Sequence, residues 1–166
     1  MTVLLLGFMG AGKTTVASYL QGHYDRFLDM DTIIEERIGM SITDFFAKEG
    51  EARFRAIESE TLQELLQTPG EVIISTGGGV VISEKNRELL RANRKRNVLL
   101  SASFEVLYNR IANDKIYQRP LFLNNSKEDF HGIYERRMML YEGLADLIIN
   151  TDNRSPEEVA KIIKCV

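Results

Sequence analysis

A short glycine-rich segment near the N-terminus carries the strongest chemical signal in the sequence. Residues 7–14 read GFMGAGKT and fit the pattern G-x-x-x-x-G-K-[ST], which is typical of loops that bind the phosphates of a nucleoside triphosphate. Glycines in this pattern let the backbone close around an anion with its N–H groups pointing inward. Lys13 could then reach the β- and γ-phosphates, and the Thr14 hydroxyl could bind Mg²⁺. The motif follows an apolar run and precedes a helical pattern, so we expect a strand, a phosphate loop and a helix in that order.

Two carboxylates flank a single residue, Met30, after the second apolar segment. We expect this segment to be a strand, so that alternation places the carboxylates of Asp29 and Asp31 on one side of the chain. Ligands of doubly wound sheets collect at this end of the strands. One carboxylate could hold Mg²⁺ through water, and the other could accept a hydrogen bond from an attacking hydroxyl. The alternative is a turn with two solvated carboxylates.

Two further segments could bind an anionic acceptor. Arg55 and Glu58 lie one helical turn apart, so Glu58 could orient the guanidinium fork of Arg55 toward a carboxylate ligand. Residues 76–79, TGGG, directly follow an apolar segment, and glycines there let the backbone approach a ligand closely. The alternatives are an exposed helical ion pair, which contributes little, and a plain flexible turn.

Apolar and helical segments alternate along the chain, which favours an α/β fold. The expected strands lie at residues 3–6, 26–29, 72–75, 98–100 and 147–149. The expected helices cover residues 13–21, 31–66 in pieces separated at Gly39 and Gly50, 83–94, 104–112, about 129–143, and a last one starting at Ser155 and Pro156. Residues 113–128 read as polar and irregular. Five short apolar strands separated by helices indicate a three-layer α/β/α architecture with a parallel sheet, formed by one domain, residues 1–166.

Composition limits the partners of the chain. It has 166 residues, with 24 acidic and 21 basic side chains and a formal net charge of −3. Because there is no overall basic field, we expect neither nucleic acid nor a membrane as a partner. The single cysteine, Cys165, and two histidines argue against a disulfide framework and against a cysteine- or histidine-based metal centre. The N-terminal apolar run is too short for a membrane span and lacks a basic leader, so we expect a cytoplasmic monomer.

The phosphate loop alone indicates a nucleoside triphosphate but leaves the reaction open. A GTPase should carry an Asn-Lys-x-Asp run for guanine, and the nearest segment, residues 113–115, does not fit it. A small chain with one nucleotide site most simply phosphorylates a small molecule, with gluconate as one alternative acceptor. A catalytically silent nucleotide-binding domain is the alternative from another class. Asp31 beside Asp29, together with Arg119 in a polar segment, argues against a silent domain.

Six features in a fixed order make the sequence resemble the shikimate kinase family over essentially its whole length. They are GFMGAGKTT at 7–15, DMD at 29–31, FRAIE at 54–58, STGGG at 75–79, QRPLF at 118–122, and Arg137 four residues before Tyr141. The resemblance implies a P-loop kinase fold like that of nucleoside monophosphate kinases, with a substrate-binding helical region at about 31–66 and a mobile lid at about 112–127. It also implies transfer of the γ-phosphoryl group of ATP to the 3-hydroxyl of shikimate with Mg²⁺, giving shikimate 3-phosphate and ADP.

The resemblance implies a set of residues on the nucleotide side. The residues that would bind the ATP phosphates are Gly10, Ala11, Gly12, Lys13, Thr14 and Thr15. Thr14, and Asp29 through water, would hold Mg²⁺. Arg119 would close on the phosphates from the lid. The residues that would lie beside the adenine are Arg110, Arg154 and Pro156.

On the acceptor side, the resemblance implies that Arg55 and Arg137 bind the carboxylate of shikimate. Asp31 would hydrogen-bond the hydroxyl that receives the phosphoryl group, which makes Lys13, Asp31 and Arg119 the catalytic set. The backbone N–H groups that would face the substrate belong to Gly77, Gly78 and Gly79. One departure from the family is the stretch from Lys13 to Asp29, which is shorter than expected and predicts a trimmed first helix or a trimmed following loop.

Overall fold

A five-stranded sheet forms the centre of the fold, with the strand order β2-β3-β1-β4-β5. The computed structural model describes residues 2–93, 96–115 and 119–166. The strands are β1 (Thr2–Leu6), β2 (Arg26–Asp29), β3 (Val72–Ser75), β4 (Asn97–Ser101) and β5 (Leu147–Asn150). Every neighbouring pair of these strands is parallel, which confirms the α/β fold expected from the sequence.

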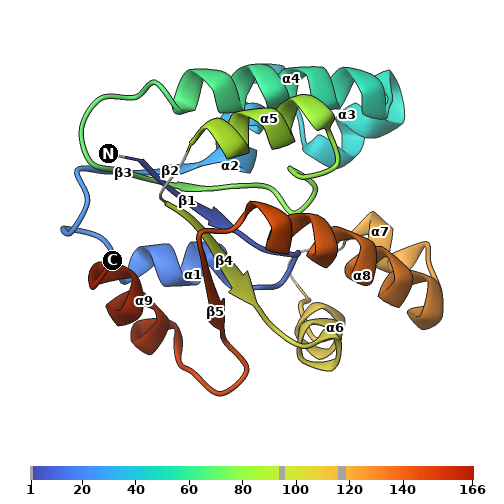
Figure 1. Cartoon of the computed structure of the whole chain (residues 1–166). Helices are drawn as coiled ribbons and strands as arrows, with labels where there is room; N and C mark the ends of the chain where they lie inside the picture. The colour runs from blue at the N-terminus through green and yellow to red at the C-terminus, as the bar shows by residue number, and fades with distance from the viewer. Residues whose placement is uncertain (1, 94–95, 116–118) are drawn as a thin grey trace.

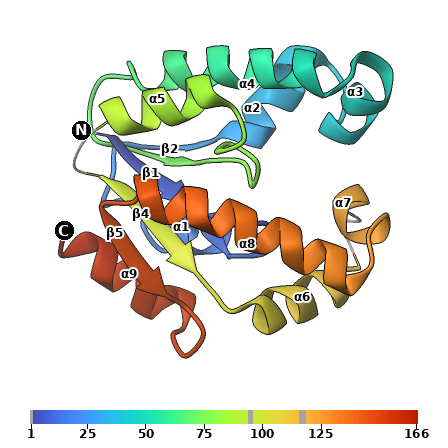
Figure 2. The ribbon, with the colours of Figure 1, turned by 45° about the vertical axis from the view of Figure 1, so that its right-hand side comes forward.

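Helices cover both faces of this sheet (Figures 1 and 2). They are α1 (Lys13–Ser18), α2 (Met30–Ile38), α3 (Ile42–Glu49), α4 (Glu51–Leu65), α5 (Glu84–Ala92), α6 (Phe104–Ala112), α7 (Pro120–Leu123), α8 (Lys127–Leu144) and α9 (Pro156–Lys164). Helices α1 and α9 contact each other, and α8 contacts both α5 and β4. Figure 2 shows α8 in front of the sheet and α1 behind it. The fold is therefore three-layered, with α2, α3 and α4 forming a helical group next to α5.

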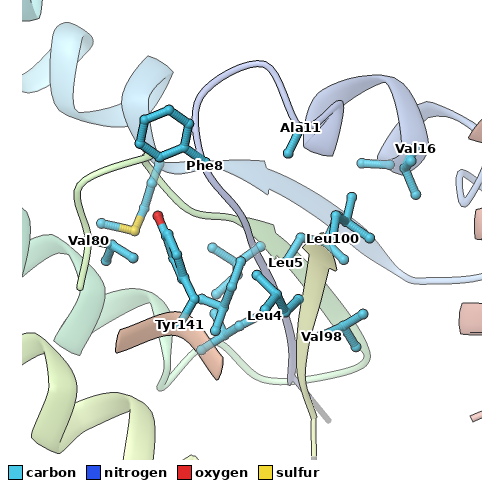
Figure 3. Close-up of a cluster of buried hydrophobic side chains, with 14 of the residues drawn as sticks. Leu4, Leu5, Phe8, Ala11, Val16, Val80, Val98, Leu100 and Tyr141 are labelled. Carbon is cyan, nitrogen blue, oxygen red and sulfur yellow. The ribbon is translucent and has the colours of Figure 1, made fainter. Parts of the chain in front are cut away.

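The central strands are apolar along their length because helices shield them on both sides. All four residues of β3 are buried, and so are residues 3–6 of β1. Figure 3 shows part of the resulting core, in which side chains of β1 and β4 meet Tyr141 of α8. The edge strand β5 instead alternates between exposed and buried positions, as a strand with less cover should.

The register of the sheet brings three chain segments together at its carboxyl end. Ser75, the last residue of β3, pairs with Leu5 of β1 on one side and with Asp29 of β2 on the other. The residues that follow these three strands therefore leave the sheet side by side. This edge is where ligands of open parallel sheets bind.

The sequence places most elements correctly and misses some details. The bounds 26–29, 72–75 and 104–112 are confirmed. The helix predicted over 13–21 ends at Ser18, and the segment 113–128, expected to be irregular, contains the short helix α7 with Pro120 as its first residue. None of the described helices combines the length and the apolar character that crossing a membrane requires.

Asn97, at the start of β4, is a buried polar residue that joins three elements. Its Nδ2 donates to the carbonyl of Leu90 in α5 at 2.8 Å and to that of Leu144 in α8 at 3.1 Å. Replacing Asn97 by Ala leaves both carbonyls without this donor, so we expect a loss of about 2–3 kcal/mol in the free energy of unfolding. Urea titration measures this loss, with Asn153→Ala at an exposed turn as a control that should change the stability by less than about 0.5 kcal/mol. Equal stabilities of the two variants would contradict this assignment.

Candidate active site

The phosphate-loop motif lies between β1 and α1, as expected. Gly12 caps α1 with a φ of 88°, a left-handed conformation that favours glycine, and Lys13 is the first helical residue. The Lys13 Nζ turns back into the loop and donates to the Gly7 carbonyl at 2.6 Å and to the Phe8 carbonyl at 3.3 Å. The residues expected to bind phosphates lie in this loop and in the first turn of α1: Gly10, Ala11, Gly12, Lys13, Thr14 and Thr15.

Charges of both signs surround the Lys13 ammonium. The pKa of Lys13 is lowered from 10.5 to about 8, mainly by burial, and the nearby guanidinium groups of Arg119 and Arg137 act in the same direction. The carboxylates of Asp31 and Asp29 act in the opposite direction. A strongly anionic ligand in the loop would add to these carboxylates and favour the charged lysine, so the loop is electrostatically suited to phosphate.

Asp29 and Asp31 lie close to the phosphate loop, but for a different reason than the sequence predicted. The strand β2 ends at Asp29, and Asp31 lies in the first turn of α2, so strand alternation does not relate the two carboxylates. Asp29 instead caps α2, because its Oδ1 accepts a hydrogen bond from the Thr32 N–H at 3.1 Å. Burial raises the pKa of Asp31, and the Lys13 ammonium partly offsets this rise. The reading of both carboxylates as solvated turn residues is therefore wrong for Asp31.

The Thr14 hydroxyl and the Asp29 carboxylate form a pair of hard oxygen donors. Thr14 Oγ1 donates to Asp29 Oδ2 at 3.3 Å, directly beside the phosphate loop. Mg²⁺ prefers oxygen ligands, and it is usually held by one or two protein groups together with phosphates and water. The donor set therefore fits the ion that the sequence implied.

The ion pair between Arg55 and Glu58 is buried, so the alternative of an exposed helical pair is wrong. Their side chains are 15% and 2% exposed, and Arg55 Nη1 donates to Glu58 Oε1 at 2.9 Å. The Asn86 Nδ2 of α5 donates to the same carboxylate oxygen at 3.1 Å. Burial raises the pKa of Glu58, and the Arg55 guanidinium lowers it. Glu58 thus fixes Arg55, while Asn86, a residue that sequence reasoning missed, fixes Glu58.

Aromatic rings line both arginines that are expected to bind a carboxylate. The Arg55 guanidinium carbon lies 5.2 Å from the centroid of the Phe54 ring and 5.7 Å from that of Phe46. The Arg137 guanidinium carbon lies 5.7 Å from the centroid of the Phe8 ring. The face of an aromatic ring attracts the guanidinium cation. The N–H donors lie along the edge of the guanidinium, so they remain available to other partners.

Three successive glycines after β3 each leave room for a different part of the site. A Cβ at Gly77 would lie 2.8 Å from Asp31 Oδ1, and a Cβ at Gly79 would lie 2.7 Å from Arg55 Nη2. A Cβ at Gly78 would lie 3.2 Å from the backbone nitrogen of Met9 in the phosphate loop. A side chain at these positions would displace the site residues, so this segment is a close-packed wall and not a plain flexible turn.

The glycine segment is also held by hydrogen bonds. Arg55 Nη1 donates to the Gly79 carbonyl at 2.9 Å. The Gly78 carbonyl accepts from Arg137 Nη1 at 3.3 Å and from the Tyr141 hydroxyl at 2.5 Å. Asp31, Arg55 and Arg137 therefore all lie around one segment, as the sequence predicted.

The remaining predicted residues are Arg119, expected to close on the phosphates, and three residues expected beside the adenine: Arg110, Arg154 and Pro156. Arg119, just before α7, is close enough to Lys13 and Asp31 to influence the pKa of both, and among the described residues its buried Nε has no hydrogen-bond partner. Arg110 Nη1 donates to the Gly10 carbonyl at 3.3 Å, which brings α6 to the phosphate loop. Arg154 follows β5 and donates to the Asn150 carbonyl at 2.6 Å. Pro156 is the exposed first residue of α9.

A hollow of about 260 Å³ lies beside Arg119, between α6 and α7. It is lined by Ile111, Ala112, Asp114, Lys115, Arg119, Phe122 and Leu123. All of these residues except Ile111 belong to the segment of about 112–127 that was expected to form a lid, of which residues 116–118 lie outside the described part of the chain. Phe122 of α7 packs against Tyr108 of α6 with ring centroids 5.1 Å apart, so the two helices beside the hollow are in contact.

Comparisons with known proteins agree on one family. The family model described as "Shikimate kinase" matches residues 9–166. A shikimate kinase of Streptococcus thermophilus is 66% identical over 166 residues, which is 100% of both chains. One of Streptococcus suis is 59% identical over 165 residues, or 99% of both chains. A solved shikimate kinase of Acinetobacter baumannii, in complex with shikimate, superposes with a TM-score of 0.86 at 34% identity, covering 98% of this chain and 89% of that chain.

Replacing Lys13 by Met should stabilise the unliganded protein near pH 7, because the change removes an ammonium whose charged form burial disfavours. In the wild type, the pKa in the folded state is about 8 and lies below the ordinary value of 10.5. Keeping Lys13 charged therefore costs the folded state the most free energy below pH 8, where the lysine is protonated in both the folded and the unfolded chain. This cost disappears as the pH rises from about 8 to about 10.5, where the unfolded chain binds more protons than the folded one.

Urea titrations of both proteins at several pH values test this expectation. Lys13→Met should exceed the wild type by about 1 kcal/mol at pH 7, because the relieved burial cost is partly offset by loss of the hydrogen bonds to the Gly7 and Phe8 carbonyls, and the advantage should shrink toward pH 10. Both proteins carry the same other ionisable side chains, so the difference isolates Lys13. A difference that stays constant from pH 7 to pH 10 would contradict a lowered pKa.

Proposed function

The chain belongs to the shikimate kinase family, and we infer that it transfers the γ-phosphoryl group of ATP to the 3-hydroxyl of shikimate, giving shikimate 3-phosphate and ADP. The observation that carries this inference is the clustering of two kinds of anion-binding group at one edge of the sheet. Lys13 lies in the phosphate loop, whereas Arg55 and Arg137 lie at the glycine segment. Asp31 contacts the glycine segment and is electrostatically coupled to Lys13, so it links the two.

We propose that Arg55 and Arg137 bind the carboxylate of shikimate. Each uses one Nη1 donor on a glycine carbonyl and keeps further N–H donors for a ligand. Two guanidinium groups on one carboxylate would fix the ring so that a single hydroxyl points at the phosphorus atom. Backbone N–H groups of Gly77, Gly78 and Gly79 would complete this side of the pocket.

Asp31 is proposed to hydrogen-bond the attacking hydroxyl. Its carboxylate lies beside Gly77, and its raised pKa makes it a better proton acceptor than an exposed aspartate. Phosphoryl transfer passes through a loose transition state, so the hydroxyl needs orientation first and loses its proton late. The proton would then move from the 3-oxygen to the Asp31 carboxylate as the new O–P bond forms.

Lys13 and Arg119 are proposed to neutralise the charge that spreads over the transferred group. Thr14 would ligate Mg²⁺ directly and Asp29 would do so through water; when bound, the ion would neutralise phosphate charge. Arg119 belongs to the lid proposed at about 112–127, whose closure would exclude water and so prevent hydrolysis of ATP. Arg110, Arg154 and Pro156 are proposed to lie near the adenine.

We also propose that the helical region 31–66, within one domain of residues 1–166, forms the shikimate side of the pocket. Arg55 and Asp31 both come from this region. The phosphate loop, the glycine segment and both arginines come together within one copy of the chain, and we propose that the enzyme acts as a monomer. Use of a cytosolic nucleotide and a lone exposed cysteine support a cytoplasmic location.

A coupled assay of ADP release tests the function directly. We expect ATP consumption with shikimate, and only background consumption with gluconate or with no acceptor. Consumption with gluconate alone would identify a different small-molecule kinase. No consumption with either acceptor, under conditions in which ATP binds, would favour a catalytically silent domain.

Replacing Arg55 by Leu should raise the KM for shikimate by about 100-fold, because one buried guanidinium–carboxylate contact is lost, and should leave the KM for ATP within about twofold. Arg53→Leu is the matched control on the same helix, since Arg53 is exposed and forms an ion pair with Glu49. That variant should behave like the wild type. A collapse of ATP affinity in Arg55→Leu with intact shikimate binding would show that the carboxylate role is wrong.

A further inference from the structure

Tyr141 is buried beneath the acceptor side of the site, in the fourth turn of α8. Its relative exposure is 0%, and its hydroxyl donates to the Gly78 carbonyl at 2.5 Å. Figure 3 shows the ring within the apolar core, with the hydroxyl at the end that lies toward Phe8 and Val80. Burial raises the pKa of Tyr141, so the hydroxyl remains a hydrogen-bond donor across the working pH range.

The acceptor of this hydrogen bond belongs to a peptide that has no side chain to hold it. The Gly78 carbonyl and the Gly79 N–H form one planar unit and point in opposite directions. Glycine allows that plane to rotate more freely than other residues do. The Tyr141 hydroxyl therefore fixes the direction of the Gly79 N–H as well as that of the carbonyl.

The same carbonyl has a second donor, and the two donors are unequal. Arg137 Nη1 lies 3.3 Å from the Gly78 oxygen, whereas the Tyr141 hydroxyl lies 2.5 Å from it. The hydroxyl thus supplies most of the hydrogen bonding that the buried oxygen needs, and the Arg137 guanidinium stays available for another partner. Without the hydroxyl, the oxygen would depend on Arg137 alone and would draw it away from the pocket.

We propose that Tyr141 is a positioning residue for shikimate, acting through the Gly78–Gly79 peptide and through Arg137. This inference rests on the proposed function. Tyr141 itself touches no reacting atom, because the glycine segment separates it from the pocket. Its contribution is to hold one wall of the acceptor site, so its loss should weaken shikimate binding far more than ATP binding.

Tyr134 offers a matched control on the same helix. Its hydroxyl also donates to the backbone carbonyl of a residue just beyond a strand, that of Ala102, at 2.6 Å. Ala102 follows β4, and β1 lies between β4 and β3, the strand that leads into the glycine segment. Tyr134→Phe therefore removes a similar hydrogen bond without changing the acceptor side, and a purely structural role for Tyr141 predicts similar kinetics for both variants.

The test is steady-state kinetics of Tyr141→Phe, Tyr134→Phe and the wild type, with each substrate varied in turn. Tyr141→Phe should raise the KM for shikimate about tenfold, as expected for the loss of one buried hydrogen bond and partial loss of a guanidinium contact, with the KM for ATP within about twofold. Tyr134→Phe should leave both KM values within about twofold. Calorimetric titration of shikimate measures the same loss of affinity without turnover.

Two results would overturn the proposal. One is an unchanged KM for shikimate in Tyr141→Phe, and the other is an equal rise of both KM values in that variant. The wild type distinguishes these results from failure of the proposed function. If the proposed function is wrong, the wild type itself will show no shikimate-dependent ADP release.

Discussion

The site depends on three consecutive residues without side chains. A Cβ would clash with the Asp31 carboxylate at Gly77 and with the Arg55 guanidinium at Gly79, and at Gly78 it would crowd the backbone of the phosphate loop. The register of the parallel sheet sets up this meeting, because β3 lies between β1 and β2 and all three end at the same edge. The three glycines therefore let the nucleotide groups and the acceptor groups approach one another across a thin wall of backbone.

The same closeness imposes an electrostatic cost that ligands can relieve. Lys13 and Asp31 are both half-buried. Burial lowers the pKa of Lys13 and raises that of Asp31, which favours the neutral form of each, while the opposite charge of the partner opposes both shifts. Burial also lowers the pKa of Arg137, and the nearby positive charge of Arg55 acts in the same direction. Triphosphate and carboxylate ligands would supply the missing negative charge. The unliganded protein thus gives up some stability so that both anions are bound strongly when they arrive.

Local sequence signals predicted the elements well, because they act over a few residues. The apolar runs of β2 and β3, and the Ser155 cap of α9, where the serine accepts from the Glu158 N–H at 3.1 Å, are examples. Helix α7 was missed because its span from Pro120 to Leu123 is too short to show helical periodicity. The extension of α2 back to Met30 was also missed, so Asp31 was assigned to the right place for the wrong reason.

Hydrogen bonds between residues far apart in the sequence could not be predicted from local sequence patterns. The pairing of Asn86 with Glu58, and of Tyr141 with Gly78, joins residues 28 and 63 positions apart. Only the four-residue spacing of Arg137 and Tyr141, which puts both on one face of a helix, hinted that the two act together. The family resemblance supplied the roles of Arg55 and Arg137, and the structure supplies the hydrogen bonds that hold them.

A crystal structure of the protein with shikimate and a non-hydrolysable ATP analogue tests the central claim most directly. We expect the shikimate carboxylate between Arg55 and Arg137, its ring against the glycine segment, and its 3-hydroxyl between Asp31 and the terminal phosphate. A shikimate molecule bound away from the three glycines, with the nucleotide in its loop, would contradict it.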